Sequence, residues 1–201
     1  MDRRDDAEFR AWLTEGGIGE DPRYPESDFL IYTAVPELSR FWLPRDVPSD
    51  LPNFLLTAVR AASGNGSCWL YLRGGGAWFA GPDGSSREAV MDRMLIGSGI
   101  GPKASGALRF GDDEWQPMLV ILIAYYTLGW HVGNDVYVVP DDRSHLLMLG
   151  HHGELRCHCA TQERLDAFIA AMAANEFFLP DHVPDSTFKV PEWMREDEGT
   201  T

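Results

Sequence analysis

Reactive side chains are concentrated between residues 145 and 159 of this chain. The stretch contains residue types that bind zinc or act as nucleophiles: His145, His151, His152, Cys157, His158 and Cys159. Structural zinc sites usually take two ligands from a Cys pair with two to four residues between them, and Cys-His-Cys is not such a pair. On a strand, Cys157 and Cys159 would face one side and His158 the other, so the three could not share one ion. We therefore expect no bound metal, with the cysteines packed inside and the histidines at a turn or on the surface.

Other catalytic patterns are incomplete. A redox pair at Cys157 and Cys159 lacks the Cys-x-x-Cys spacing and the helix N-terminus that such pairs use. The glycine-rich residues 97–103 resemble a phosphate loop, but Pro102 removes a backbone N–H and no Ser or Thr follows Lys103. We expect no cofactor and no enzymatic activity. The alternative is an enzyme or metal-binding protein that uses residues 145–159.

Size and charge narrow the classes of partner. The 201 residues, of which 44% are hydrophobic, suffice for one domain with a substantial core. Acidic residues outnumber basic ones by 31 to 17, which gives a formal net charge of −14 at pH 7. A field of this sign repels nucleic acid and anionic membranes and attracts a basic protein. The charge therefore predicts a basic protein partner, with no nucleic acid and no membrane; the alternative is that it serves solubility alone.

Acidic residues gather towards both ends of the chain. Residues 1–50 hold twelve Asp or Glu against six Arg, and residues 181–198 hold six against two basic residues. Aromatic side chains stand among these charges, as they do in protein–protein interfaces. We predict that the two ends form a partner-binding face, with these candidate residues: Trp12, Tyr24, Trp42, Trp193, Asp181 and Asp185. The alternative is a solvated acidic surface whose aromatic residues turn inward.

Hydrophobic periodicity predicts a single α+β domain over residues 1–201. An antiparallel sheet, made of a hairpin (68–72 with 77–80) and a three-stranded meander (130–139, 145–149 and 154–159), is expected to pack against a central helix at 114–128. That helix lacks a polar stripe, so it should be buried on nearly all sides, with Gly129 as its end. Flanking helices are expected at 7–15, 51–62, 85–95 and 161–172. The ends are expected to form an acidic, partly irregular segment (1–27), an extended arm (179–194) and a loose tail (195–201).

Targeting signals are not evident. The N-terminus lacks the apolar run of a signal peptide, and the longest apolar run, 118–126, falls short of the roughly 20 residues that span a bilayer. Three cysteines do not make a disulfide framework and suit a reducing compartment. The sequence therefore predicts a soluble, cytoplasmic protein.

Several short motifs resemble those of a known class of bacterial protein. They are Trp-Leu-Tyr-Leu at 69–72, the glycine turn at 73–76 with Trp78, Gly-Trp-His-Val-Gly-Asn-Asp-Val-Tyr-Val-Val-Pro at 129–140, and Gly-His-His-Gly at 150–153. In this layout, residues 68–159 resemble the small immunity proteins that accompany polymorphic toxins. The resemblance implies an acidic protein-binding module that neutralises a toxin domain, such as a basic nuclease. It supplies no catalytic residues.

Overall fold

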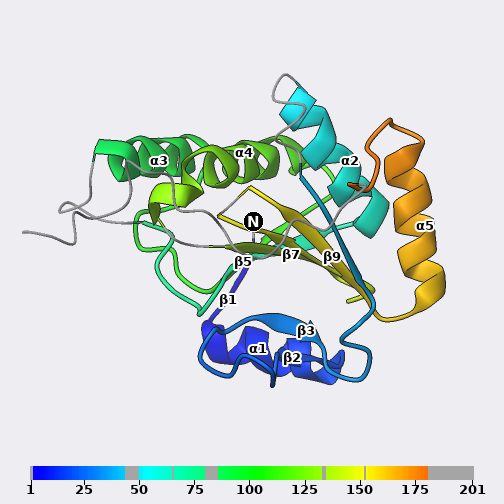
Figure 1. The fold of residues 1–201 in the computed structure, drawn as a ribbon. Coiled ribbons are helices and arrows are strands. Elements are labelled where there is room, and N and C mark those ends of the chain that lie inside the picture. The colour runs from blue at the N-terminus through cyan, green and yellow to red at the C-terminus, as the bar shows by residue number, and fades with distance from the viewer. Residues whose placement is uncertain are drawn as a thin grey trace, which may run out of the picture.

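The computed structural model describes residues 2–43, 50–64, 66–79, 86–132, 135–151 and 153–180. The helices within these residues are α1 (Asp6–Glu15), α2 (Leu51–Ser63), α3 (Ser86–Gly97), α4 (Trp115–Val132) and α5 (Gln162–Ala173). The strands are β1 (Asp2–Arg4), β2 (Ile18–Glu20), β3 (Leu30–Tyr32), β4 (Ser39–Trp42), β5 (Cys68–Leu72), β6 (Ala107–Phe110), β7 (Val136–Pro140), β8 (His145–Leu149) and β9 (Leu155–Cys159). The α+β class predicted from the sequence is confirmed (Figure 1).

Within the described residues, seven strands form one antiparallel sheet in the order β1-β6-β5-β7-β8-β9-β4. Its centre contains the predicted meander, because β7 pairs with β8 and β8 pairs with β9. A separate two-stranded sheet pairs β2 with β3.

The seven-stranded sheet separates two apolar layers. In Figure 1 the helices α2, α3, α4 and α5 cover one face, whereas α1 with β2 and β3 covers the other. Strand alternation supplies both layers: on β5, Leu70 and Leu72 join the cluster beneath the helices, and Trp69 and Tyr71 join the cluster beneath α1. We call residues 5–37, which contain α1, β2 and β3, the N-terminal layer.

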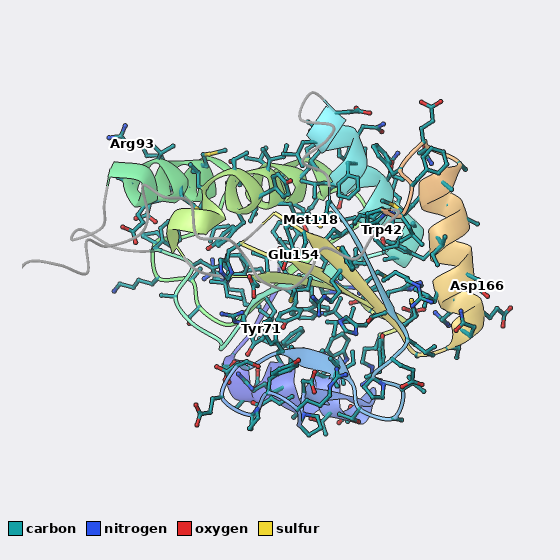
Figure 2. The ribbon with its side chains drawn as sticks, viewed as in Figure 1. Trp42, Tyr71, Arg93, Met118, Glu154 and Asp166 are labelled. Carbon is teal, nitrogen blue, oxygen red and sulfur yellow. The ribbon has the colours of Figure 1, made fainter. Side chains whose placement is uncertain are left out.

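Two tyrosine hydroxyls fix the N-terminal layer to the sheet. Tyr71 on β5 donates to the carboxylate of Asp6 at the start of α1, and Figure 2 shows Tyr71 between the sheet and that layer. Tyr137 on β7 accepts a hydrogen bond of 3.0 Å from the backbone N–H of Leu30. Residues 1–27, for which we predicted one helix and otherwise a loop, thus contain β1 and β2 as well as α1.

The central helix differs from its prediction at two points. α4 continues past Gly129 to Val132, so the strand predicted from residue 130 begins only at Val136. The helix is also not buried on all sides: Ile121 is fully buried against the sheet side, whereas Val120 is 39% exposed. The sheet, α2 and α3 cover only part of the helix circumference, which leaves Gln116, Val120 and Thr127 exposed among the described residues of α4.

The predicted hairpin at residues 68–80 is wrong. β5 pairs with β6 on one side and β7 on the other, which leaves no free edge for the segment that follows the glycine turn. That segment instead joins the loop before β6: Ala77 forms an isolated bridge with Ser105. The indole N–H of the buried Trp78 donates to the carbonyl of Gly106 at 2.8 Å, which holds the segment there.

Candidate functional site

The connection between β2 and β3, residues 21–29, is an acidic loop closed by its own hydrogen bonds. Asp21 at its start is buried and forms a salt bridge of 2.7 Å with Arg23. The backbone N–H of Tyr24 donates to the carbonyl of Asp21, and that of Ser27 to the carbonyl of Tyr24, each at 3.0 Å. Hydrogen bonds from Arg23 hold the pKa of Asp21 below its ordinary value, so this carboxylate stays ionised. The loop is therefore preformed.

The loop presents an aromatic side chain among carboxylates. Tyr24 is 59% exposed, with the Arg23 guanidinium 6.0 Å from its ring. Glu26 and Asp28 are exposed on the same loop, and Glu37 is exposed beside it. Among the described residues, no basic side chain forms an ion pair with these three carboxylates. The hydrogen bond to Asp21 raises the pKa of Arg23 most, and Tyr24 and Glu37 add to the shift, so Glu37 lies close to the loop. We call Tyr24, Glu26, Asp28 and Glu37 the acidic patch.

Trp12, a second predicted partner residue, is half-buried in a stack of rings and guanidinium groups. The Arg4 guanidinium lies 5.1 Å from the Trp12 ring and 4.7 Å from the Trp69 ring, and Arg143 lies 5.1 Å from Trp12. Beside this stack is a surface cavity of about 420 Å³. Trp12 thus fastens α1 to the sheet and offers only part of its ring to a partner.

Trp42, the third predicted partner residue, is 1% exposed, so its assignment to a binding face is wrong. β4 pairs with β9, which places Trp42 opposite Leu155. Its ring packs edge-on against Phe168 of α5, with the centroids 5.3 Å apart. Its segment, β4, is an edge strand of the sheet. The remaining candidates, Trp193, Asp181 and Asp185, lie outside the described residues.

The cysteine and histidine positions follow the predicted alternation on β9. Cys157 and Cys159 belong to the cluster beneath the helices, with their sulfur atoms 3.6 Å apart. His158 points to the opposite face, close enough to Asp21 for their charges to interact. Within the described part of the chain, which omits His152, no group of three His, Cys, Asp or Glu side chains is arranged to hold a metal ion.

The predicted surface location of the histidines is wrong for His145 and His158, which are both buried. His145 stands opposite Cys159 in the β8–β9 register, and its Nδ1 lies 2.8 Å from the hydroxyl of Ser144. The imidazole Nδ1 of His158 has no hydrogen-bond partner among the described residues. The pairing of β8 with β9 is as predicted, but the layers that pack on the sheet bury both rings, and the local sequence does not show this packing; the His145 ring, for example, lies 5.8 Å from the Phe168 ring of α5.

Burial should make His158 a source of pH-dependent stability. Desolvation, aided by the charge of Arg156, lowers its pKa to about 4, although Asp21 opposes this shift and Arg23 reinforces it. Because the pKa of an unfolded histidine is higher, this group's contribution is complete above about pH 6.5 and is lost as the pH falls through 4. Urea titrations at about pH 7 and pH 4.5 should show a loss of about 2.4 kcal/mol, from about 1.4 kcal/mol per pKa unit. The free energy of unfolding of His158→Gln should fall clearly less between these two pH values. An equal fall in the wild-type and variant proteins would show that His158 is not the source of the pH dependence.

Asp135, a buried carboxylate that the sequence did not single out, connects the ends of three strands of the sheet. Asp135, 2% exposed, accepts from the backbone N–H of His151 at 2.8 Å and from its Nδ1 at 2.6 Å. Arg73 completes the cluster by an ion pair with Asp135 and places its guanidinium 4.8 Å from the Phe29 ring. Burial opposes ionisation, but the hydrogen bonds from His151 and the charge of Arg73 lower the pKa of Asp135. The cluster thus links the ends of β5, β7 and β8 to the acidic loop.

Comparisons of the chain with protein-family models, with curated proteins and with solved structures find no match. No helix among the described residues combines the length and the apolar character needed to cross a membrane. The assignment of a function therefore depends on the chain's own geometry.

Proposed function

We propose that this protein binds a basic protein through the acidic patch and acts as an immunity protein that neutralises a toxin domain such as a nuclease. One observation carries the proposal: Tyr24 is held 59% exposed by a closed loop, among carboxylates without ion-pair partners in the described structure. Aromatic anchors supply much of the binding energy of protein interfaces, and an excess of one charge around them selects a partner of the opposite charge. The one cation beside Tyr24 among the described residues, Arg23, is paired with the buried Asp21, which leaves the excess negative.

The rigidity of the loop supports this role. The salt bridge between Asp21 and Arg23 and the turn hydrogen bonds exist before any partner arrives. A preformed loop loses less conformational entropy on association than a loop that must fold on binding. The Arg73 contact with Phe29 and the bond from Leu30 to Tyr137 join the end of this loop to the sheet. The patch is thus built to keep its shape in a complex.

The net charge of −14 supports the choice of partner. A nuclease must present basic residues to a phosphate backbone. An acidic protein that covers those residues would meet the nuclease rapidly and compete with its substrate. The motifs between residues 68 and 159 that resemble immunity proteins support the same assignment. The three free cysteines fit a reducing compartment, so we propose the cytoplasm as its location.

Two charge-reversal variants separate the acidic patch from a general effect of charge. The first double variant, Glu26→Lys with Glu37→Lys, reverses two charges in the patch. The second, Glu163→Lys with Asp166→Lys, changes the net charge of the protein by the same amount but on α5. All four residues are exposed, and Figure 2 shows Asp166 on α5, away from the N-terminal layer. A partner isolated from the native host on the wild-type protein should bind the α5 variant almost as wild type. It should bind the patch variant at least about tenfold more weakly, a loss of about 1.4 kcal/mol.

Circular dichroism and thermal melting establish that both variants are folded before binding is compared. An equal loss of affinity in the two variants would show that net charge causes the effect and that the acidic patch is not the binding site. A partner that is itself acidic would contradict the proposed mode of binding.

A further inference from the structure

Two thiols lie side by side on the helical face of β9. The sulfur atoms of Cys157 and Cys159 are 3.6 Å apart, and either can donate its S–H to the other. Both side chains are fully buried. Residues i and i+2 of a strand face the same side, so the pleat brings together two sulfurs that the Cys-x-Cys spacing alone does not pair.

The surroundings of the two thiols differ. The hydrogen bond from Cys157, followed by that of His145, lowers the pKa of Cys159 against the opposing effect of burial, and the charge of Arg164 acts in the same direction. Burial and the neighbouring sulfur raise the pKa of Cys157. The Nδ1 of His145 is held by the Ser144 hydroxyl at 2.8 Å, which orients the imidazole towards its cross-strand neighbour. Of the two thiols, Cys159 is therefore the one that loses its proton more readily.

A helix start lies next to the more acidic thiol. α5 begins at Gln162, and Thr161 caps it by accepting a hydrogen bond of 3.3 Å from the backbone N–H of Arg164. The positive end of a helix dipole favours a nearby anion such as a thiolate. Cys159 itself lies on β9, two residues before this cap, so neither cysteine is part of the helix N-terminus, in keeping with the sequence prediction.

We propose that Cys157 and Cys159 form a redox site at which a peroxide converts the two thiols into a disulfide, with Cys159 as the attacking sulfur and His145 as its positioning residue. This inference is independent of the proposed binding function. Hydrogen peroxide is only slightly larger than water, so local opening where β9 meets α5 suffices to admit it.

The proposed reaction balances in two steps. The Cys159 thiolate attacks one peroxide oxygen; an S–O bond forms, the O–O bond breaks, and the departing hydroxide takes up the proton that the thiol had released, which gives water and a sulfenic acid. The Cys157 sulfur then attacks the Cys159 sulfur; the S–S bond forms, the S–O bond breaks, and hydroxide leaves with the Cys157 proton as a second water. The two sulfurs together lose two electrons, which the peroxide accepts.

The resulting disulfide should be easy to reduce. A strand rises about 3.3 Å per residue, so the Cα atoms of residues i and i+2 lie about 6.6 Å apart. Disulfides usually span at most about 6.8 Å between Cα atoms, and strained ones are more reducible. Easily reduced bridges are typical of regulatory or catalytic sites, whereas structural disulfides resist reduction.

Peptide mass analysis tests the site directly. The reduced full-length protein is treated with hydrogen peroxide, unfolded in the presence of N-ethylmaleimide, and digested with trypsin. Arg156 and Arg164 place both cysteines in one peptide, 157–164. We expect this peptide to be two hydrogens lighter and free of maleimide after peroxide, and to carry two maleimides when a thiol reductant follows the peroxide.

Cys68 is an internal control. It is equally buried, its nearest sulfur belongs to Met118 at 3.2 Å, and burial raises its pKa to about 12, so it should still react with maleimide after peroxide. Oxidation of Cys68 as fast as the 157–164 peptide, or a peptide that keeps two maleimides throughout, would overturn the proposal.

Two variants assign the roles within the pair. In Cys157→Ser, oxidation should stop at a sulfenic acid on Cys159 that dimedone traps. In His145→Gln, the pH at which the oxidation rate reaches half its maximum should move upwards, towards the ordinary thiol value of about 8.5. Dimedone capture on the remaining thiol of Cys159→Ser at the same rate, or an unchanged pH profile in His145→Gln, would contradict the assigned roles.

Discussion

Replacing Ile121 by Asp is expected to abolish folding. Ile121 is fully buried on the side of α4 that faces the sheet, in the cluster beneath the helices. A carboxylate at this position would lie in a cluster of hydrophobic side chains. Leaving a buried charge unpaired costs about 3–5 kcal/mol or more, which is much of the stability of a typical domain. Circular dichroism and urea titration should therefore show an unfolded or insoluble protein.

The neighbouring residue provides a matched control. Val120 precedes Ile121 on the same helix but is 39% exposed, so Val120→Asp introduces the same charge into solvent. We expect this variant to fold with a loss of about 1 kcal/mol or less. A soluble Ile121→Asp protein that melts cooperatively, or an equal loss from both substitutions, would show that the buried face of α4 is assigned wrongly.

Trp42→Ala is expected to destabilise the protein by about 3–5 kcal/mol, the usual effect of removing a large core aromatic residue. Trp42 is 1% exposed and joins β4 to α5 through its edge-on contact with Phe168. Trp42→Phe should lose much less stability, because an aromatic ring still contacts Phe168. This substitution also removes the buried indole N–H, which has no hydrogen-bond partner among the described residues. Urea titrations of the three proteins measure the difference.

The same experiment separates the core from the proposed interface. Tyr24→Ala should leave the free energy of unfolding within about 0.5 kcal/mol of wild type, because the side chain is mostly in solvent. A Trp42→Ala protein as stable as wild type, with weakened partner binding, would instead restore Trp42 as an interface residue.

The meander β7–β8–β9 is predictable because its information is local. Alternating side chains and the two turns between these strands specify their pairing without reference to distant residues. The sheet order is not predictable in this way. β5 lies between β6 and β7, and the segment after its glycine turn forms a bridge with Ser105. Both arrangements depend on contacts between residues far apart in the sequence.

Two errors arise where tertiary packing overrides local preference. Gly129 is a typical helix stop, but a glycine inside a helix costs only about 1 kcal/mol relative to alanine, which the packing of α4 against α2 and α3 can offset. Trp42 lies between charged and proline-containing segments that suggest a surface loop, yet pairing with β9 buries it. In the candidate site, the sequence identifies Tyr24 but not Asp135 or Arg73, because their ion pair joins residues from separate strands.

The salt dependence of association tests most directly whether the acidic patch captures a basic partner. Stopped-flow mixing with the isolated partner should show association that slows markedly as salt is raised past physiological strength, where charges are screened beyond about 8 Å. The Glu26→Lys and Glu37→Lys double variant should associate slowly at low salt and lose most of this dependence, whereas the Glu163→Lys and Asp166→Lys variant should keep it. Tyr24→Ala should mainly speed dissociation. An association rate indifferent to salt, or the same salt dependence in both double variants, would contradict the account.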